Sequence, residues 1–181
     1  GYYTAPFDGV MRLLIIPASL MGAVYPMVSG HLAVGNHETI HRLYAQSLQK
    51  TILLLAAPSL LLGIAGPFLL RLWLGNAFAA EGAVAIRILA FGVFVTAVAR
   101  VPSGFLTALG RPDVIAKVHA AELVFHVPLA WYLIGKFGVS GAALAWTIRV
   151  AVDSVVLSVA SSRVMSGFTL CDGRSVLDSA Q

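Results

Sequence analysis

Five ionisable residues stand at helical spacing inside strongly apolar sequence. Glu122 and His126 follow His119 by three and seven positions, so a helix places all three on one face. Arg149 and Asp153 are four positions apart and share a face in the same way. A charged side chain at the centre of a membrane helix costs about 2.5 to 3.5 kcal/mol, so such residues usually pair with one another or face water. We therefore expect them to line a polar interior.

The two groups are expected to face each other, because a tight turn near Gly138 joins the segments that carry them. Residues equally far from this turn lie at similar depth, and an offset of one helical turn pairs Glu122 with Arg149 and His126 with Asp153. Two roles stay open. The residues form a structural charge network that holds one helix against the other, or they also contact a substrate or a coupling ion.

These residues match no motif for metal binding or enzymatic catalysis. The spacing of His119, Glu122 and His126 fits no HExxH-type signature, so we expect neither a metal site nor a cofactor. The sequence also shows no Ser-His-Asp order, no Gly-rich phosphate loop after a strand and no carboxylate cluster suited to group transfer. A function other than catalysis is expected.

Two further arginines are candidates for contact with a substrate. Arg87 lies near the end of an apolar stretch, where a long side chain reaches the membrane surface. Arg100 lies two helical turns from the opposite end of the same stretch, and the neighbouring Pro102 and Gly104 favour a local opening of the helix.

The elements that must position these residues are predicted to be membrane-spanning helices. The chain has 181 residues, of which 59% are hydrophobic and only 11% charged, far below the charge of ordinary soluble domains. Helices satisfy the backbone hydrogen bonds of a chain in lipid, and about 20 apolar residues suffice to cross it. We expect an all-α membrane protein with about five spans, at residues 10–28, 51–72, 84–107, 115–134 and 140–160.

The arrangement of basic residues predicts how the chain is oriented. Lys and Arg in short loops stay on the cytoplasmic side. One face, formed by the loops around residues 29–50 and 108–114 and by the tail, carries six basic residues, whereas the other has only Lys136 clearly outside a helix. We expect the first face and the C-terminus to be cytoplasmic, with an amphipathic segment at 37–49 lying on that surface. The net charge of +4 is spread over loops and helix ends, so no nucleic acid partner is expected.

The ends of the chain favour a fragment of a longer protein. The N-terminus has neither an initiating Met nor a basic, signal-like start. We expect a transmembrane lobe at residues 1–168 and a polar cytoplasmic tail at 169–181, which holds the single cysteine, Cys171.

Several short motifs occur in a characteristic order. The chain opens with GYY, has Pro17 and Pro26 in its first span, and continues with LWLGNAF at 72–78, RILA at 87–90, LTALGRPD at 106–113 and FGVSGAALAW at 137–146. Over residues 1–168 it resembles the C-terminal half of bacterial polysaccharide (O-antigen-type) flippases of the multidrug/oligosaccharidyl-lipid/polysaccharide exporter superfamily.

The resemblance implies a bundle of 12 to 14 helices in two lobes that moves undecaprenyl-diphosphate-linked oligosaccharide across the bacterial inner membrane by alternating access. It implies as partners this lipid-linked oligosaccharide, the bilayer and a missing N-terminal lobe. In a cationic cavity Arg87, Arg100 and Arg149 would offset the charge of the diphosphate. The sequence departs from the family in having an odd number of spans and no N-terminal half. A multidrug exporter of the same fold and a non-transporting scaffold for envelope assembly are the alternatives.

Overall fold

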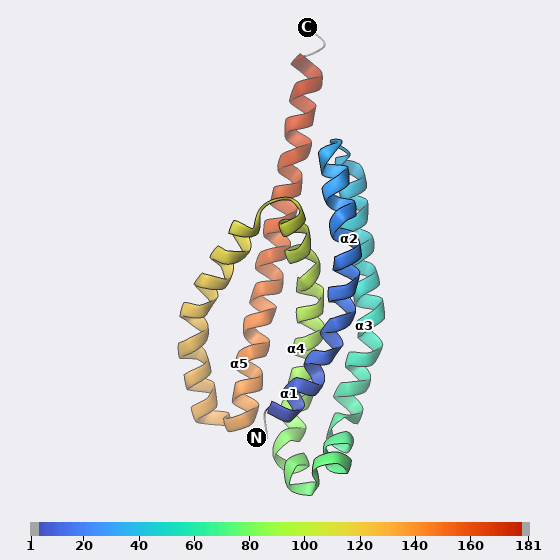
Figure 1. Ribbon diagram of the computed structural model, residues 1–181. Coiled ribbons are helices and arrows are strands. Elements are labelled where there is room, and N and C mark those ends of the chain that lie inside the picture. Colours follow the sequence, from blue (N-terminus) through green and yellow to red (C-terminus); the bar gives the residue numbers. More distant parts are fainter. Residues whose placement is uncertain (1–3, 179–181) are drawn as a thin grey trace.

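A computed structural model describes the backbone of residues 4–178 and the side chains of residues 7–72, 75, 76, 79 and 82–167. Over this range the chain is helical and contains no strand (Figure 1). The elements are α1 (Thr4–Met11), the 3-10 turn η1 (Arg12–Leu14), α2 (Ile15–Ala33), α3 (His37–Leu74), α4 (Asn76–Ala108) and α5 (Pro112–Asp178). The predicted all-α class is confirmed.

Helix α5 is two helices joined by a sharp reversal at Gly138, whose φ of 54° and ψ of −126° are not helical. We call residues 112–137 its first arm and residues 139–178 its second arm. The predicted spans at 115–134 and 140–160 lie one in each arm. Four helical segments are long and apolar enough to cross a membrane, and the last of these, Pro112–Gly167, contains both arms. Figure 1 shows the first arm standing away from the other helices and the second arm returning beside α4.

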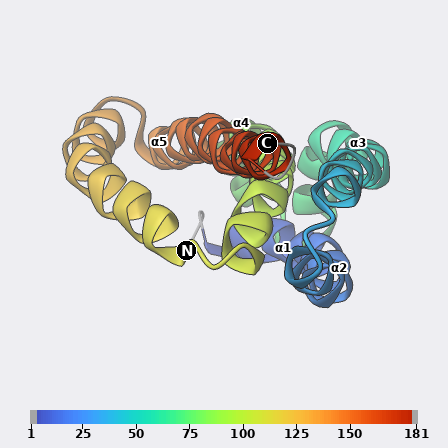
Figure 2. The same ribbon diagram turned by 90° about the horizontal axis from the view of Figure 1, so that it is seen from above.

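Helix α4 is the centre of the packing, in contact with both α3 and α5, while α2 packs on α3 and α4. Figure 2 shows this order from above, with the first arm of α5 outside the bundle. Small residues allow the close approach of α4 and the second arm. A Cβ atom at Gly92 would lie only 2.5 Å from the Trp146 ring. The Thr147 hydroxyl donates a hydrogen bond of 3.3 Å to the Ile88 carbonyl.

Large apolar side chains cover the outside of the bundle, which fits a surface in contact with lipid. On α3, Leu53, Leu60, Leu61, Ile64 and Phe68 are each about two-thirds exposed or more. Soluble proteins rarely expose so large a contiguous apolar surface, whereas a bilayer covers it.

Two features of the helices differ from the sequence-based expectations. The amphipathic segment 37–49 is not a separate surface helix: α3 runs unbroken from His37, because the segment contains no Gly or Pro and Asn36 caps the helix by accepting a hydrogen bond of 3.1 Å from the Thr39 N–H. The first span is interrupted by η1. The backbone of the polar tail is helical up to Asp178, while residues 179–181 and the Cys171 side chain lie outside the described parts.

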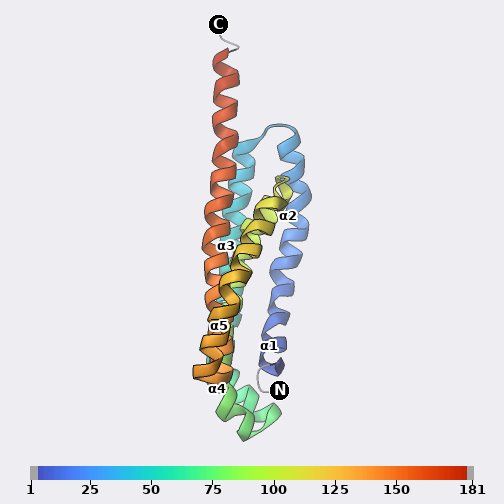
Figure 3. The ribbon, with the colours of Figure 1, turned by 90° about the vertical axis from the view of Figure 1, so that its left-hand side faces the viewer.

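The connections alternate between the two ends of the bundle. Figures 1 and 3 show the α2–α3 and α4–α5 connections at the end toward which the C-terminal part of α5 extends. The start of α1, the α3–α4 connection and the turn of α5 lie at the opposite end. The face rich in basic residues and the opposite face, both predicted from the sequence, therefore correspond to the two ends of the bundle.

Candidate functional site

The two arms of α5 are linked by an ion pair in the middle of the hairpin. The Arg149 Nε donates to the Glu122 Oε2 at 3.4 Å. The Glu122 side chain is 8% exposed and that of Arg149 is 38% exposed. Within the first arm only Glu122 and Leu133 are buried, and every other residue of this arm is partly or fully exposed. The predicted Glu122–Arg149 pair is present.

A second ion pair lies one turn away and differs from the prediction. The His119 Nε2 is 3.3 Å from the Asp153 Oδ1, although no hydrogen bond joins the two atoms. The predicted pairing of His126 with Asp153 is wrong for a geometric reason. In an antiparallel hairpin, a step forward on one arm is matched by a step backward on the other. Once Glu122 faces Arg149, Asp153 must face a residue before Glu122, which is His119.

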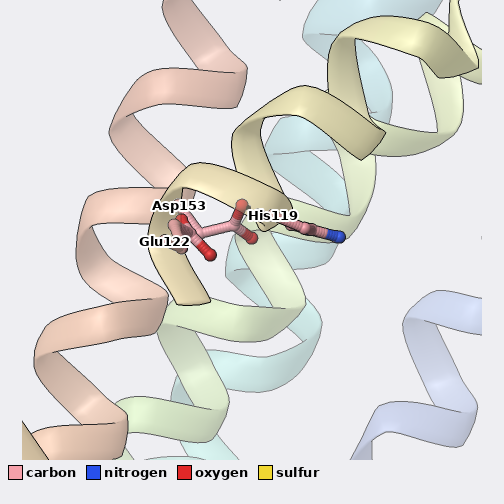
Figure 4. A group of neighbouring side chains, drawn as sticks. All are labelled: His119, Glu122 and Asp153. Carbon is pink, nitrogen blue, oxygen red and sulfur yellow. Dashed lines mark ion pairs between the residues drawn. The ribbon is translucent and has the colours of Figure 1, made fainter. Parts of the chain in front are cut away.

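His119, Glu122 and Asp153 form one cluster between the arms (Figure 4). Each residue has one atom that could coordinate a metal ion, and these three atoms lie within 4.8 Å of one another. Two carboxylates and an imidazole are donors that a cation could use. The Arg149 guanidinium beside Glu122 already supplies one positive charge to this set.

The cluster borders a cavity of about 350 Å³ between α1, α4 and α5, whose wall is partly polar and partly apolar. Arg100 of α4 and Arg149 of α5 both line it, together with His119 and Asp153. Aromatic side chains form another part of the wall, where the rings of Phe7 and Trp146 meet edge to face with centroids 5.5 Å apart.

The sequence reasoning missed two hydroxyl groups of this cavity, those of Thr96 and Ser103. Thr96 precedes Arg100 by four positions and Ser103 follows it by three, so a helix places all three on one face. This spacing relative to Arg100 could have identified both residues from the sequence.

A groove of about 520 Å³ on another side of the hairpin is mostly apolar. Arg149, Glu122 and His126 reach it among apolar side chains such as Phe125 and Val152. The His126 Nδ1 is buried and has no hydrogen-bond partner among the described residues.

Arg87 lies apart from all of these residues. It lines a groove of about 410 Å³ between α3 and α4, with Ser59, Phe91 and Phe94. Arg100 follows Arg87 by thirteen positions on α4, which corresponds to about 20 Å along a helix. Of the seven candidate site residues, five therefore lie in the hairpin and Arg100 lies beside it on α4. Arg87 lies at a different groove.

These features define a multi-pass helical membrane protein with charged residues gathered around an open cavity between its helices. The MatE family profile matches residues 5–132 of the chain, and the chain belongs to this family. The resemblance to the multidrug/oligosaccharidyl-lipid/polysaccharide exporter superfamily is confirmed, and the match points to a transporter rather than an enzyme.

A curated relative from Shigella flexneri carries the name "Putative O-antigen transporter". It is 30% identical over 167 residues, which cover 92% of this chain and 39% of the relative. The chain therefore spans about two fifths of the length of that protein. No solved structure matches the chain significantly.

Proposed function

We propose that this chain is the C-terminal lobe of an exporter that moves a lipid-linked oligosaccharide of the undecaprenyl-diphosphate type across the bacterial inner membrane. The cavity that Arg100 and Arg149 share is the observation that carries the proposal. Guanidinium groups bind phosphate oxygens through two parallel hydrogen bonds, and a diphosphate offers such oxygens to two arginines. The name of the Shigella flexneri relative supports the same class of cargo.

The two arginines have different roles in this proposal. Arg149 is already paired with Glu122, so it links the two arms of the hairpin. Its positive charge also contributes to the electrostatic potential of the cavity. Arg100 is exposed and makes no ion pair with any described residue, so its guanidinium is available to a ligand. Thr96 and Ser103 beside it and the aromatic wall of Phe7 and Trp146 offer contacts suited to a sugar.

Alternating access requires a second lobe to close this cavity. We propose that the missing N-terminal lobe covers the open side of the hairpin, where the first arm of α5 contributes exposed apolar side chains such as Phe125 and Trp131. The concentration of basic residues at one end of the bundle supports a cytoplasmic location for that end and for the C-terminus.

The test is flipping of a fluorescent undecaprenyl-diphosphate oligosaccharide by the full-length protein in proteoliposomes. We expect Arg100→Gln to weaken apparent affinity by about tenfold to a hundredfold, the effect of losing one charged hydrogen-bonding partner. Arg87→Gln is the matched control, since it removes an exposed arginine of the same helix that lines a different groove. The control should flip substrate like the unmodified protein.

Two results would contradict the proposal. Equal loss of flipping in Arg87→Gln and Arg100→Gln would show that the shared cavity has no particular part in transport. An intact protein that flips no lipid-linked oligosaccharide but exports cationic drugs would identify a multidrug exporter. If it moves neither, a scaffold role in envelope assembly takes its place.

A further inference from the structure

The groove between α3 and α4 combines an apolar surface with a single charged residue. It has a volume of about 410 Å³ and contains Arg87. Small residues, Ala56, Gly63 and Ala90, leave space between the two helices. Larger apolar side chains surround this space, and three of them are 60% to 70% exposed on the outside of the bundle: Leu60, Ile64 and Phe91. The groove is therefore open to the surrounding bilayer.

The charge of the groove comes from Arg87. No carboxylate is found among the described residues that line it. The Arg87 side chain is exposed and makes no ion pair with any described residue. The hydroxyl oxygen of Ser59 is buried, so the surface offered to a ligand is apolar except at Arg87. An unpaired guanidinium next to an apolar surface favours an anion that also carries an apolar chain.

Arg87 lies near one membrane end of its helix. The apolar span of α4 begins at Gly82, and Arg87 follows it by five positions, or about 8 Å. Side chains on a helix lean toward its N-terminus, which for α4 is at this same end of the bundle (Figure 1). The guanidinium therefore reaches toward the level of the lipid headgroups. Phe94, seven positions further along α4, places the rest of the groove about 10 Å deeper in the membrane.

We propose that this groove binds one anionic phospholipid, with the lipid phosphate at Arg87 and an acyl chain between Leu60 and Phe91. The single positive charge of Arg87 complements the single negative charge of a phosphatidylglycerol headgroup. Guanidinium groups match the geometry of phosphate oxygens, and basic pockets between membrane helices bind anionic headgroups. The exposed apolar side chains along the groove are in contact with the bilayer from which this lipid enters.

The lipid site is separate from the cavity proposed for the cargo. The residues that line the groove include none of those around Arg100 and Arg149. The groove is formed by α3 and α4, whereas α1, α4 and α5 form the cavity. Loss of the phospholipid should therefore leave cargo flipping unchanged, and the site does not depend on which cargo the protein carries.

Binding is measured by native mass spectrometry of the full-length protein in detergent, titrated with phosphatidylglycerol or with phosphatidylcholine. We expect one phosphatidylglycerol to bind more tightly than phosphatidylcholine. Arg87→Gln should weaken this binding by about tenfold, the effect of losing one charged hydrogen-bonding partner. Arg71→Gln is the matched control, because Arg71 is an exposed arginine near the same end of α3 that does not line the groove. The control should bind phosphatidylglycerol like the unmodified protein.

The apolar part of the groove is tested by Gly63→Leu, which leaves Arg87 in place. A Cβ atom at Gly63 would lie 3.9 Å from the Ala90 Cβ, an ordinary contact, and the longer leucine side chain would fill space that the acyl chain needs. We expect the affinity for phosphatidylglycerol to fall by about tenfold, the effect of about two methylene groups left unburied. Leucine favours a helix over glycine, so the variant should fold, which thermal unfolding without added lipid checks.

The occupant of the groove in membranes is identified by a photo-reactive amino acid in place of Leu60, whose side chain is 66% exposed. We expect it to crosslink to phospholipid. Crosslinks to another segment of the full-length protein, or to a second copy, would overturn the inference, because protein would then cover the groove.

Three further outcomes would overturn it. The first is unchanged phosphatidylglycerol binding in Arg87→Gln or in folded Gly63→Leu, and the second is an equal loss in Arg71→Gln. The third is displacement of the phospholipid by an undecaprenyl-diphosphate oligosaccharide, because the groove would then belong to the path of the cargo. None of these measurements depends on whether the protein flips lipid-linked oligosaccharide.

Discussion

For Glu122, the sequence predicts the ion-pair partner, but only the structure shows the burial of its side chain. Its pairing with Arg149 was predictable, because both residues lie at helical spacing on either side of the turn at Gly138. Which histidine meets Asp153 was not, since the pairing depends on the direction of the offset between the arms. The buried, unpaired oxygen of Glu122 also depends on packing, which a sequence does not contain.

Removing Arg149 should destabilise the protein through Glu122. In Arg149→Met the Glu122 carboxylate remains buried without its partner, a loss worth about 1 to 3 kcal/mol. We expect a lower midpoint of thermal unfolding for the full-length protein in detergent. The double variant Arg149→Met/Glu122→Gln should recover part of that loss, because the charge and the unpaired group are removed together.

The exposed pair of Arg111 and Asp113, 3.1 Å apart, provides the comparison. Arg111→Met should leave the unfolding midpoint unchanged, as is usual for ion pairs in contact with water. A double variant no more stable than Arg149→Met would indicate that Arg149 stabilises the hairpin by contacts other than its pair with Glu122.

Among the elements, the turn of α5 is the feature most strictly set by residue type. Gly138 has a φ of 54°, a conformation that other residues adopt only with strain. We expect Gly138→Ala to lower the free energy of unfolding by about 1 to 3 kcal/mol, measured by chemical denaturation of the full-length protein.

Gly135 lies three residues earlier in the same hairpin and serves as the control. Its φ is not positive, and an added Cβ would meet no atom within 4 Å. Gly135→Ala should be neutral or slightly stabilising, since alanine favours a helix over glycine. Similar losses in both variants would contradict the assignment of strain to the turn.

The helices themselves were largely predictable because length and apolar character are local properties of the sequence. The turns at Gly35, Gly75, Gly110 and Gly138 all occur at positive-φ glycines, and glycine is a residue type that typically marks breaks between helices. The 3-10 turn at Arg12–Leu14 and the continuity of α3 depend on contacts and capping, and the sequence did not reveal them. The separation of the first arm from the bundle likewise depends on the whole arrangement of helices.

At the scale of the whole molecule, the unequal number of basic residues at the two ends of the bundle predicts its orientation in the membrane. A green fluorescent protein fused after the C-terminus should fluoresce, since this reporter matures in the cytoplasm and the C-terminal end carries the excess of basic residues. The same reporter fused after Gly135, at the opposite end, should remain dark. Fluorescence only in the second fusion would reverse the proposed orientation.

The hairpin of α5 has a consequence for how the protein is made. Its arms are joined by one non-helical residue, so they can enter the bilayer together as a pair during synthesis. Four ionisable side chains then reach the lipid already matched, Glu122 with Arg149 and His119 with Asp153. A charge carried by a single helix would have to wait for a distant partner. In this hairpin Glu122 and Arg149 lie on opposite arms, and each supplies the counter-charge of the other.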